Sequence, residues 1–181
     1  MKKKHAPLTA VVAIAMSPAL HCGRLAAEDN IQVAGDVLQV ALPATAAGLT
    51  LGHRDGQGAL QLGKSLAVTL GVTYALKYSI DAKRPNGGGQ SFPSAHTSIS
   101  FSAAEFMRKR YGWEYGVPAH AAASFVAYSR VESRQYNPQD VVAGAGIGIL
   151  SSYIFTKPYK GWHVNVAGDT KSFGVRLTRH V

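Results

Sequence analysis

Basic side chains recur in this chain at spacings that suit the binding of a tetrahedral anion. Lys77 and Arg84 precede a Pro-Ser-Ala-His tetrapeptide that contains Ser94 and His96, and Arg130 follows later. A phosphate monoester carries up to two negative charges, so its capture needs several donors that converge from different elements. The lysine and the two arginines supply fixed positive charges, and a guanidinium can bind two oxygens at once. Ser94 and the amides that start the following helix would add neutral donors, aided by the helix dipole.

The complete pattern has three parts. It reads Lys77, six residues, Arg84-Pro85; then Pro93-Ser94-Ala95-His96; then Ser129-Arg130, five residues, Tyr136, three residues, Asp140. The pattern resembles the signature of the type 2 phosphatidic acid phosphatase and vanadium haloperoxidase (PAP2) superfamily, KxxxxxxRP, PSGH and SRxxxxxHxxxD. The spacing matches throughout, and the resemblance is strongest over residues 70–156. Two positions depart from it, because Ala95 replaces a glycine and Tyr136 replaces a histidine.

The resemblance implies a role for each position. The phosphate-binding residues would be Lys77, Arg84, Ser94, Ala95 and Arg130. His96 would be the general acid that protonates the leaving alcohol, which suits a group with a reference pKa of roughly 6.5. In the family, the histidine replaced by Tyr136 attacks phosphorus and forms a phosphohistidine, and the aspartate matched by Asp140 orients its ring. No cofactor is expected, and no HExxH or CxxC cluster suggests a zinc site.

The two departures have different consequences. In a helical conformation Ala95 fits, and it stabilises the helix by up to about 1 kcal/mol relative to glycine, whereas a positive φ would make its methyl group crowd the site. Tyr136 matters more, because a phenol with a reference pKa of roughly 10 is mostly protonated at neutral pH. A nearby Asp140 would raise that pKa, while Arg130 and Arg134 would lower it. The i+4 spacing of Asp140 suits a contact with Tyr136 if the segment is helical.

Taken one at a time, these residues have simpler explanations. Arg84 and Arg130 could pair with Asp81 or Glu132, and Ser94 could serve only as a helix cap. The joint occurrence at family spacing favours a site. It leaves the role of Tyr136 open.

Composition limits the class of partner. The chain has 181 residues and a formal net charge of +9, enough length for one domain with a hydrophobic core. An excess of positive charge suits an anionic substrate or an anionic membrane surface. No basic stripe with interleaved aromatic residues is present, which argues against nucleic acid.

The chain divides into three expected parts. Residues 1–27 have the basic start, short apolar run and small residues of a secretory signal, with an uncleaved anchor as the alternative. The only cysteine, Cys22, lies within that segment, so no disulfide is expected. Residues 28–157 would form the phosphatase-like domain, and residues 158–181 a tail. We therefore expect an exported, periplasmic protein, soluble or membrane-associated, with an integral membrane protein as the alternative.

The expected fold class is all-α, a PAP2-like helical bundle with a short C-terminal β-hairpin. Glycine and proline punctuation divides the helices. Their expected ranges are 31–51 with an interruption at Pro43, 58–79, 95–110, 119–128 after a break over 112–118, and 139–155 behind Pro138. Alternating apolar residues in the tail predict the hairpin.

Three functions fit this sequence. The first is a PAP2-family acid phosphatase that hydrolyses phosphate monoesters, including lipid or isoprenoid phosphates. The second is a protein that binds phosphate esters but has lost turnover with its nucleophilic histidine. The third is a vanadium haloperoxidase, which is disfavoured because that enzyme anchors vanadium through the same missing histidine.

Overall fold

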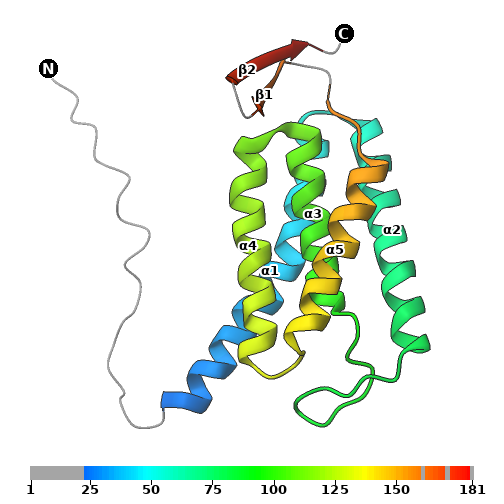
Figure 1. Ribbon diagram of the computed structural model, residues 1–181, viewed down its shortest axis with the longest axis vertical. Coiled ribbons are helices and arrows are strands. Elements are labelled where there is room, and N and C mark those ends of the chain that lie inside the picture. The colour runs from blue at the N-terminus through cyan, green and yellow to red at the C-terminus, as the bar shows by residue number, and fades with distance from the viewer. Residues whose placement is uncertain (1–22, 160–161, 170–171, 180–181) are drawn as a thin grey trace, which may run out of the picture.

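The computed structural model describes residues 23–159, 162–169 and 172–179, with side chains described over residues 30–159. Its helices pack into a bundle (Figure 1). They are α1 (Gly23–Gly52), α2 (Gly56–Ser79), α3 (Ala95–Tyr111), α4 (Trp113–Glu132) and α5 (Pro138–Phe155). The prediction of a helical bundle is confirmed.

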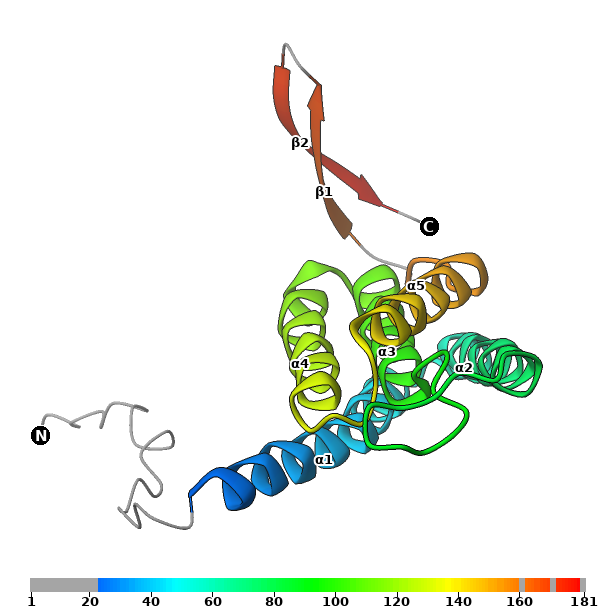
Figure 2. The ribbon, with the colours of Figure 1, turned by 60° about the horizontal axis from the view of Figure 1, so that its bottom comes forward.

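Two strands follow the helices. They are β1 (Trp162–Asp169) and β2 (Ser172–Arg179), and they pair antiparallel. Trp162 lies opposite Arg179 at one end of the pair, and Asp169 lies opposite Ser172 at the other. Figure 2 shows this pair extending away from the five helices.

Local capping explains where three of the helices start. Asp55 precedes α2 and accepts a 2.8 Å hydrogen bond from the Gly58 N–H. Ser94 precedes α3, and its Oγ accepts from the Thr97 N–H at 3.4 Å. Pro138 is the first residue of α5, a position where its missing N–H costs little. The sequence predicted the last two of these starts, and both are confirmed.

Two predicted helix breaks are wrong. α1 begins at Gly23 and continues through Pro43, and α4 begins at Trp113 and continues through Pro118. A proline inside a helix costs about 3 kcal/mol or more. Buried residues next to both prolines offset this cost, since Leu42 and Ala119 belong to the hydrophobic core. Tertiary packing therefore outweighs the local signal.

α3 lies at the centre of the bundle and contacts all four other helices. Its apolar core residues are fully or almost fully buried; they include Ala103, Ala104, Phe106 and Met107. The close approach of α5 depends on Gly144 and Gly148. A Cβ on Gly144 would lie within 3.0 Å of the backbone oxygen of Ser94, the cap of α3, and a Cβ on Gly148 would lie within 3.0 Å of that of Ser98 in α3.

Buried hydroxyl groups also join the helices. Thr73 Oγ1 of α2 donates to Ser98 Oγ of α3 at 3.0 Å, and Ser102 Oγ of α3 bonds to Ser152 Oγ of α5 at the same distance. These bonds satisfy polar groups that would otherwise be costly to bury. They hold α2 and α5 at fixed positions along α3.

The end of the bundle farthest from the start of α3 is closed by a buried ion pair. Arg110 Nε donates to Asp55 Oδ2 at 2.7 Å, and the Tyr111 hydroxyl donates to the same oxygen at 3.0 Å. The end of α3 is thereby fixed to the start of α2. The other end of the bundle carries the sequence motifs.

Residues 1–22 lie outside the described residues, so the secretory signal stays a prediction. Within the described residues, one helix segment, Asn30–Gly52, is long and apolar enough to cross a membrane. Its mean hydropathy is 1.2, and only 22% of this apolar stretch is buried inside the bundle. A segment of this kind near the N-terminus is weak evidence for a span.

Candidate active site

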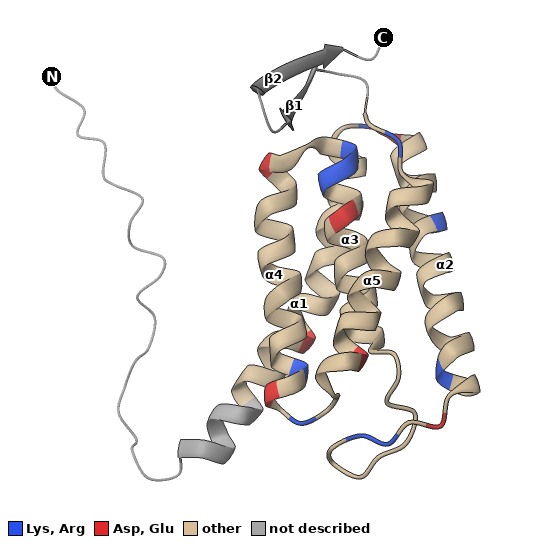
Figure 3. Cartoon of the chain, in the orientation of Figure 1, with Lys and Arg blue, Asp and Glu red and all other residues tan. Residues whose placement is uncertain are grey.

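Residues from all three motifs meet at one end of the bundle, around the ring of Tyr136. Figure 3 shows Lys and Arg at this end, in the last turn of α2, in the loop that follows and at the end of α4. Lys77 Nζ lies 5.4 Å from the Tyr136 ring centroid and Arg84 Cζ lies 4.8 Å from it. The imidazole centroid of His96 is 6.2 Å from the same ring. The structure therefore places two predicted cations and the predicted general acid around one side chain, that of Tyr136.

Lys77 reaches this site from the last turn of α2. Its side chain is buried, and Nζ donates to the Gln90 carbonyl at 2.7 Å. Gln90 adopts a positive φ of 55°, and Ser91 N–H bonds back to the Ala82 carbonyl at 2.8 Å, which closes the loop between α2 and α3. Burial, followed by the charge of Arg84, lowers the pKa of the Lys77 ammonium.

Two buried nitrogen atoms at this site have no hydrogen-bond partner. They are Arg84 Nε and His96 Nδ1, and the other unpaired buried side-chain atoms among the described residues are hydroxyl oxygens. A buried donor without a partner costs about 1–3 kcal/mol. Such a cost at two neighbouring positions is typical of a site whose ligand supplies the missing partners.

Ser94 and Ala95 form the start of α3. The Ser94 side chain is fully buried, and its Oγ accepts from the Thr97 hydroxyl at 3.1 Å as well as from the Thr97 amide. Ala95 is helical and is absent from the non-glycine residues with positive φ. The alanine therefore fits the backbone without strain. Ser94 acts as a cap while its own hydroxyl proton stays free to donate.

Arg130 is held by α1, which no sequence motif covers. Its Nη1 bonds to Asp36 Oδ1 at 2.8 Å, its Nη2 donates to the Gln32 carbonyl at 2.7 Å, and its Nε donates to Ser129 Oγ at 3.2 Å. Gly35 permits this approach, because a Cβ there would come within 3.0 Å of Ser129 and Arg130. Within the described residues, no ion pair joins Arg130 to Glu132 or Arg84 to Asp81.

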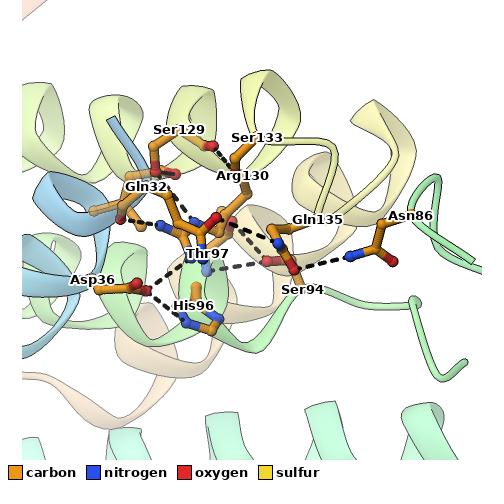
Figure 4. A network of polar contacts seen from close by, with 11 residues as sticks. Gln32, Asp36, Asn86, Ser94, His96, Thr97, Ser129, Arg130, Ser133 and Gln135 are labelled. Carbon is orange, nitrogen blue, oxygen red and sulfur yellow. Dashed lines mark hydrogen bonds and ion pairs between the residues drawn. The ribbon is translucent and has the colours of Figure 1, made fainter. Parts of the chain in front are cut away.

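Asp36 also contacts the predicted general acid. Its Oδ1 lies 3.3 Å from His96 Nε2, so a single carboxylate oxygen joins His96 and Arg130 (Figure 4). Burial and then the charge of Arg130 lower the pKa of His96, and Asp36 acts in the opposite direction. The sequence did hold one signal for this residue, because Asp36 is the only charged residue between Ile31 and Leu51.

A chain of side-chain amides lies beside this ion pair. Gln135 Nε2 donates to Gln32 Oε1 at 3.4 Å, and Asn86 Nδ2 donates to Gln135 Oε1 at 3.3 Å (Figure 4). These bonds connect α1, the α4–α5 loop and the α2–α3 loop. They fix the loop that carries Arg84 to the α4–α5 loop and, through Gln135, to α1.

Tyr136 is buried, with 4% of its surface exposed. Its ring is in contact with cations, yet burial raises the pKa of its phenol, and the charges of Arg84 and Arg130 oppose that shift. The phenol is therefore protonated at neutral pH. This protonation state argues against its acting readily as a nucleophile.

The hydrogen bonds of the Asp140 side chain go to residues other than Tyr136. Its Oδ2 accepts from the Ser91 hydroxyl and from the Asn137 N–H, the latter at 3.0 Å. Asn137 is extended, with φ −75° and ψ 153°, so Tyr136 lies before α5 and the assumed helical i+4 contact does not form. That contact was expected only for a helical segment, and α5 begins at Pro138, as the sequence predicted. Asp140 instead fixes the start of α5 to the α2–α3 loop, and among the described residues no hydrogen bond joins Asp140 to Tyr136.

The remaining histidines with described side chains lie elsewhere. His120 bonds to the Gly116 carbonyl at 2.9 Å and contacts Glu105 at 3.5 Å, and His53 stacks on Tyr111. Neither can replace the missing nucleophile. Among the described residues no group of three His, Cys, Asp or Glu side chains could hold a metal ion.

Comparison with known proteins agrees with these motifs. Residues 58–162 match the PAP2 superfamily, a range that starts after α1. The chain is similar to lipid A 4'-phosphatase of Helicobacter pylori strain J99, with 34% identity over 138 residues that cover 70% of this chain and 69% of that protein.

Two crystal structures share the fold. LpxE from Aquifex aeolicus is 20% identical with a TM-score of 0.53, and the match covers 73% of this chain and 93% of that one. The first transmembrane PAP2-type phosphatidylglycerolphosphate phosphatase from Bacillus subtilis is 22% identical with a TM-score of 0.55, covering 72% and 73%. With the motifs, the matched range and the fold in agreement, this chain belongs to the PAP2 superfamily.

Proposed function

We propose that this protein is a phosphatase that hydrolyses phosphate monoesters of membrane lipids. The observation that carries the proposal is the pair of unpaired buried nitrogens, Arg84 Nε and His96 Nδ1, which belong to side chains close to the Tyr136 ring. A phosphate group supplies acceptor oxygens for both donors and negative charge for the cations. The relatives support a lipid substrate, because their names refer to lipid A and phosphatidylglycerolphosphate.

The reaction follows from these positions. Lys77, Arg84 and Arg130 would neutralise the phosphoryl oxygens as charge develops on them. As the bond between phosphorus and the ester oxygen breaks, His96 gives that oxygen a proton and releases the lipid alcohol. In the family mechanism a histidine at the position of Tyr136 takes the phosphoryl group, and water then releases inorganic phosphate. In this chain the Tyr136 oxygen would bond to phosphorus as the ester bond breaks, and its phenol proton would pass to water.

Phosphate release tests this proposal. The purified protein in detergent micelles is supplied with lipid A, phosphatidylglycerolphosphate or a soluble phosphate monoester. We expect release from a lipid phosphate, and a loss of about 10²- to 10⁴-fold in kcat for His96→Ala, the range typical of a general acid. Absence of release from every substrate, or an unchanged rate in His96→Ala, would contradict the proposal.

A second function is favoured by Tyr136 itself. The raised pKa of this buried phenol favours a protein that binds phosphate esters without turning them over. In that case the cations still hold the phosphate, and position 136 supplies no nucleophile. The protein would then act as a binding module for lipid phosphates.

Tyr136→His separates the two functions. For a binding protein, the wild type is inert and the histidine variant gains phosphate release. For an enzyme that uses the phenol, the wild type already turns over and Tyr136→Phe abolishes release. Trapping of a ³²P-labelled intermediate on residue 136 identifies the nucleophile in either variant.

A membrane location accompanies this function. Val33, Val37, Val40 and Leu51 are 58–77% exposed, and their spacing places them on one side of α1. A contiguous exposed apolar surface marks an interaction site. We therefore expect the protein to float with anionic lipid vesicles in a density gradient, and Val37→Glu/Val40→Glu to weaken this association.

Export remains part of the proposal. With residues 1–27 as a secretory signal, the domain would reach lipid phosphates outside the cytoplasm. N-terminal sequencing of the mature protein tests this, with a start at Glu28 expected. A start at Met1 would favour the uncleaved anchor.

A further inference from the structure

Asp36 occupies an unusual place for a carboxylate. It lies on α1, outside the residues matched to the family, and its Oδ1 is 3.3 Å from His96 Nε2 and 2.8 Å from Arg130 Nη1. Its side chain is 45% exposed, whereas that of Arg130 is 2% exposed. One oxygen of a partly exposed acid thus joins the predicted general acid to a predicted phosphate-binding cation.

Two roles are compatible with such a contact. The carboxylate could occupy the position of a phosphate oxygen and compete with the substrate, or it could hold His96 and Arg130 in place for the substrate. The orientation of His96 favours the second role. Because Asp36 accepts from Nε2, the buried Nδ1 is left without a partner and is the ring nitrogen available to a ligand.

The anchoring of Arg130 supports the same conclusion. Its guanidinium has five N–H groups, and three of its contacts go to Asp36, the Gln32 carbonyl and Ser129 Oγ. The remaining N–H groups can still bind a phosphate oxygen. Asp36 therefore fixes the position of Arg130 and leaves it donors for the substrate. Gly35 lets α1 come close enough for both contacts.

We propose that Asp36 is a positioning residue for the phosphatase reaction, which orients His96 through Nε2 so that Nδ1 delivers the proton to the leaving alcohol. This inference rests on the proposed function. It assigns to α1 the carboxylate–histidine contact that Asp140 does not make. In the family, the aspartate of the third motif pairs with the histidine of the same motif. In this chain, Asp36 of α1 pairs with His96 of the second motif.

The proton balance of the step is simple. His96 starts protonated on both nitrogens, with Nε2–H bonded to Asp36 and Nδ1–H directed at the ester oxygen. As the phosphorus–oxygen bond breaks, the Nδ1 proton moves to that oxygen, and the neutral imidazole keeps its bond to Asp36. The carboxylate favours the imidazolium before transfer and fixes the tautomer after it.

Asp36→Asn tests this role in a way that does not need activity. The groups that face His96 are Asp36 from α1, Arg130 from α4, Arg84 from the α2–α3 loop and Tyr136 from the α4–α5 loop. Removing the one negative charge among them leaves the arginines to disfavour the imidazolium. We expect NMR titration of His96, assigned with His96→Gln, to show a lower pKa in Asp36→Asn than in the wild type.

Glu114→Gln is the matched control, because it removes an equal charge from an exposed position at the start of α4, beyond the far end of α3. It should leave the His96 titration unchanged. Asp36→Glu should restore part of the wild-type titration, because it keeps the carboxylate. A His96 pKa that is the same in the wild type and Asp36→Asn, with both folded by circular dichroism, would overturn the proposal.

Kinetics give the second readout. In Asp36→Asn we expect the decline of kcat/KM with rising pH to move to lower pH, and kcat to fall more than KM rises. Tighter binding of inorganic phosphate in Asp36→Asn with an undiminished kcat would instead identify Asp36 as a competitor of the substrate and overturn the positioning role. If the wild type is inert but the His96 pKa is still lower in Asp36→Asn than in the wild type, the proposed hydrolysis is contradicted. The coupling between Asp36 and His96 is then still supported.

Discussion

The guanidinium of Arg84 lies over the ring of Tyr136, with its Cζ atom 4.8 Å from the ring centroid. The neutral ring of Tyr136 thus occupies the position of the family's imidazole. It contacts Arg84, the cation that would bind the substrate. This contact gives Tyr136 a structural role that is independent of nucleophilic attack. It also explains how the site keeps its cations together without the histidine.

The first prediction concerns that contact. Tyr136→Leu removes the ring, and we expect the affinity for tungstate, a tetrahedral oxyanion, to fall about 2- to 30-fold, corresponding to roughly 0.5–2 kcal/mol for a cation–π contact. Tyr136→Phe keeps the ring and should bind tungstate like the wild type. Isothermal titration calorimetry measures both. Equal losses in the two variants would show that the hydroxyl, rather than the ring, supports binding.

Arg84 provides the second prediction. Arg84→Gln removes a charged donor whose Nε is buried and unpaired, and the affinity for inorganic phosphate should fall roughly 10- to 100-fold, given about 1.5–3 kcal/mol for a charged hydrogen bond. Lys83→Gln is the control, because it removes the same charge from the exposed neighbouring residue. A similar loss in both variants would mean that long-range charge alone drives binding.

The third prediction concerns pH. Burial and Arg130 lower the pKa of His96 below its reference value of 6.5. A general acid works only while protonated, so kcat/KM should decline as the pH rises through this lowered pKa, which places the decline below pH 6.5. The substrate's own ionisation is measured separately by ³¹P NMR. In His96→Gln, the pH profile of kcat/KM should lack the decline caused by deprotonation of the enzyme. A decline that begins only above pH 6.5 would contradict the assignment.

The fourth prediction concerns the α3–α5 contact. Gly148→Ala places a methyl group against the Ser98 backbone oxygen, and we expect the free energy of unfolding to fall by about 1–3 kcal/mol. Gly146→Ala, on the same helix with nothing within 4 Å, should stabilise by up to about 1 kcal/mol. Thermal unfolding followed by circular dichroism measures both. A stable Gly148→Ala would mean that α5 can move away from α3.

Much of the site was predictable because its residues follow local rules. Ser94 caps a helix in the way its side chain dictates, and Pro138 starts one because its missing N–H costs nothing there. The spacing of Lys77, Arg84 and His96 matched the family motifs and predicted that these side chains lie close together. The structure brings these three side chains close to Tyr136, and their roles in a common site stay a prediction.

The features that were missed depend on contacts between distant segments. Leu42 and Ala119 keep helices continuous past Pro43 and Pro118, which no local signal reveals. Asp36 lies 94 residues before Arg130, and only the packing of α1 against α4 brings the two together. The i+4 contact between Asp140 and Tyr136 required a helical segment, and it does not form because α5 begins only at Pro138.

The most direct test of the account is the side-chain NMR signal of Arg84 Nε during a titration with tungstate. If the unpaired nitrogen is a donor to the substrate phosphate, its ¹H and ¹⁵N shifts should move saturably and in parallel with those of His96 Nδ1. If both signals stay in place while tungstate is in large excess, the cations do not form an anion site, and the proposed phosphatase chemistry has no basis at this end of the bundle.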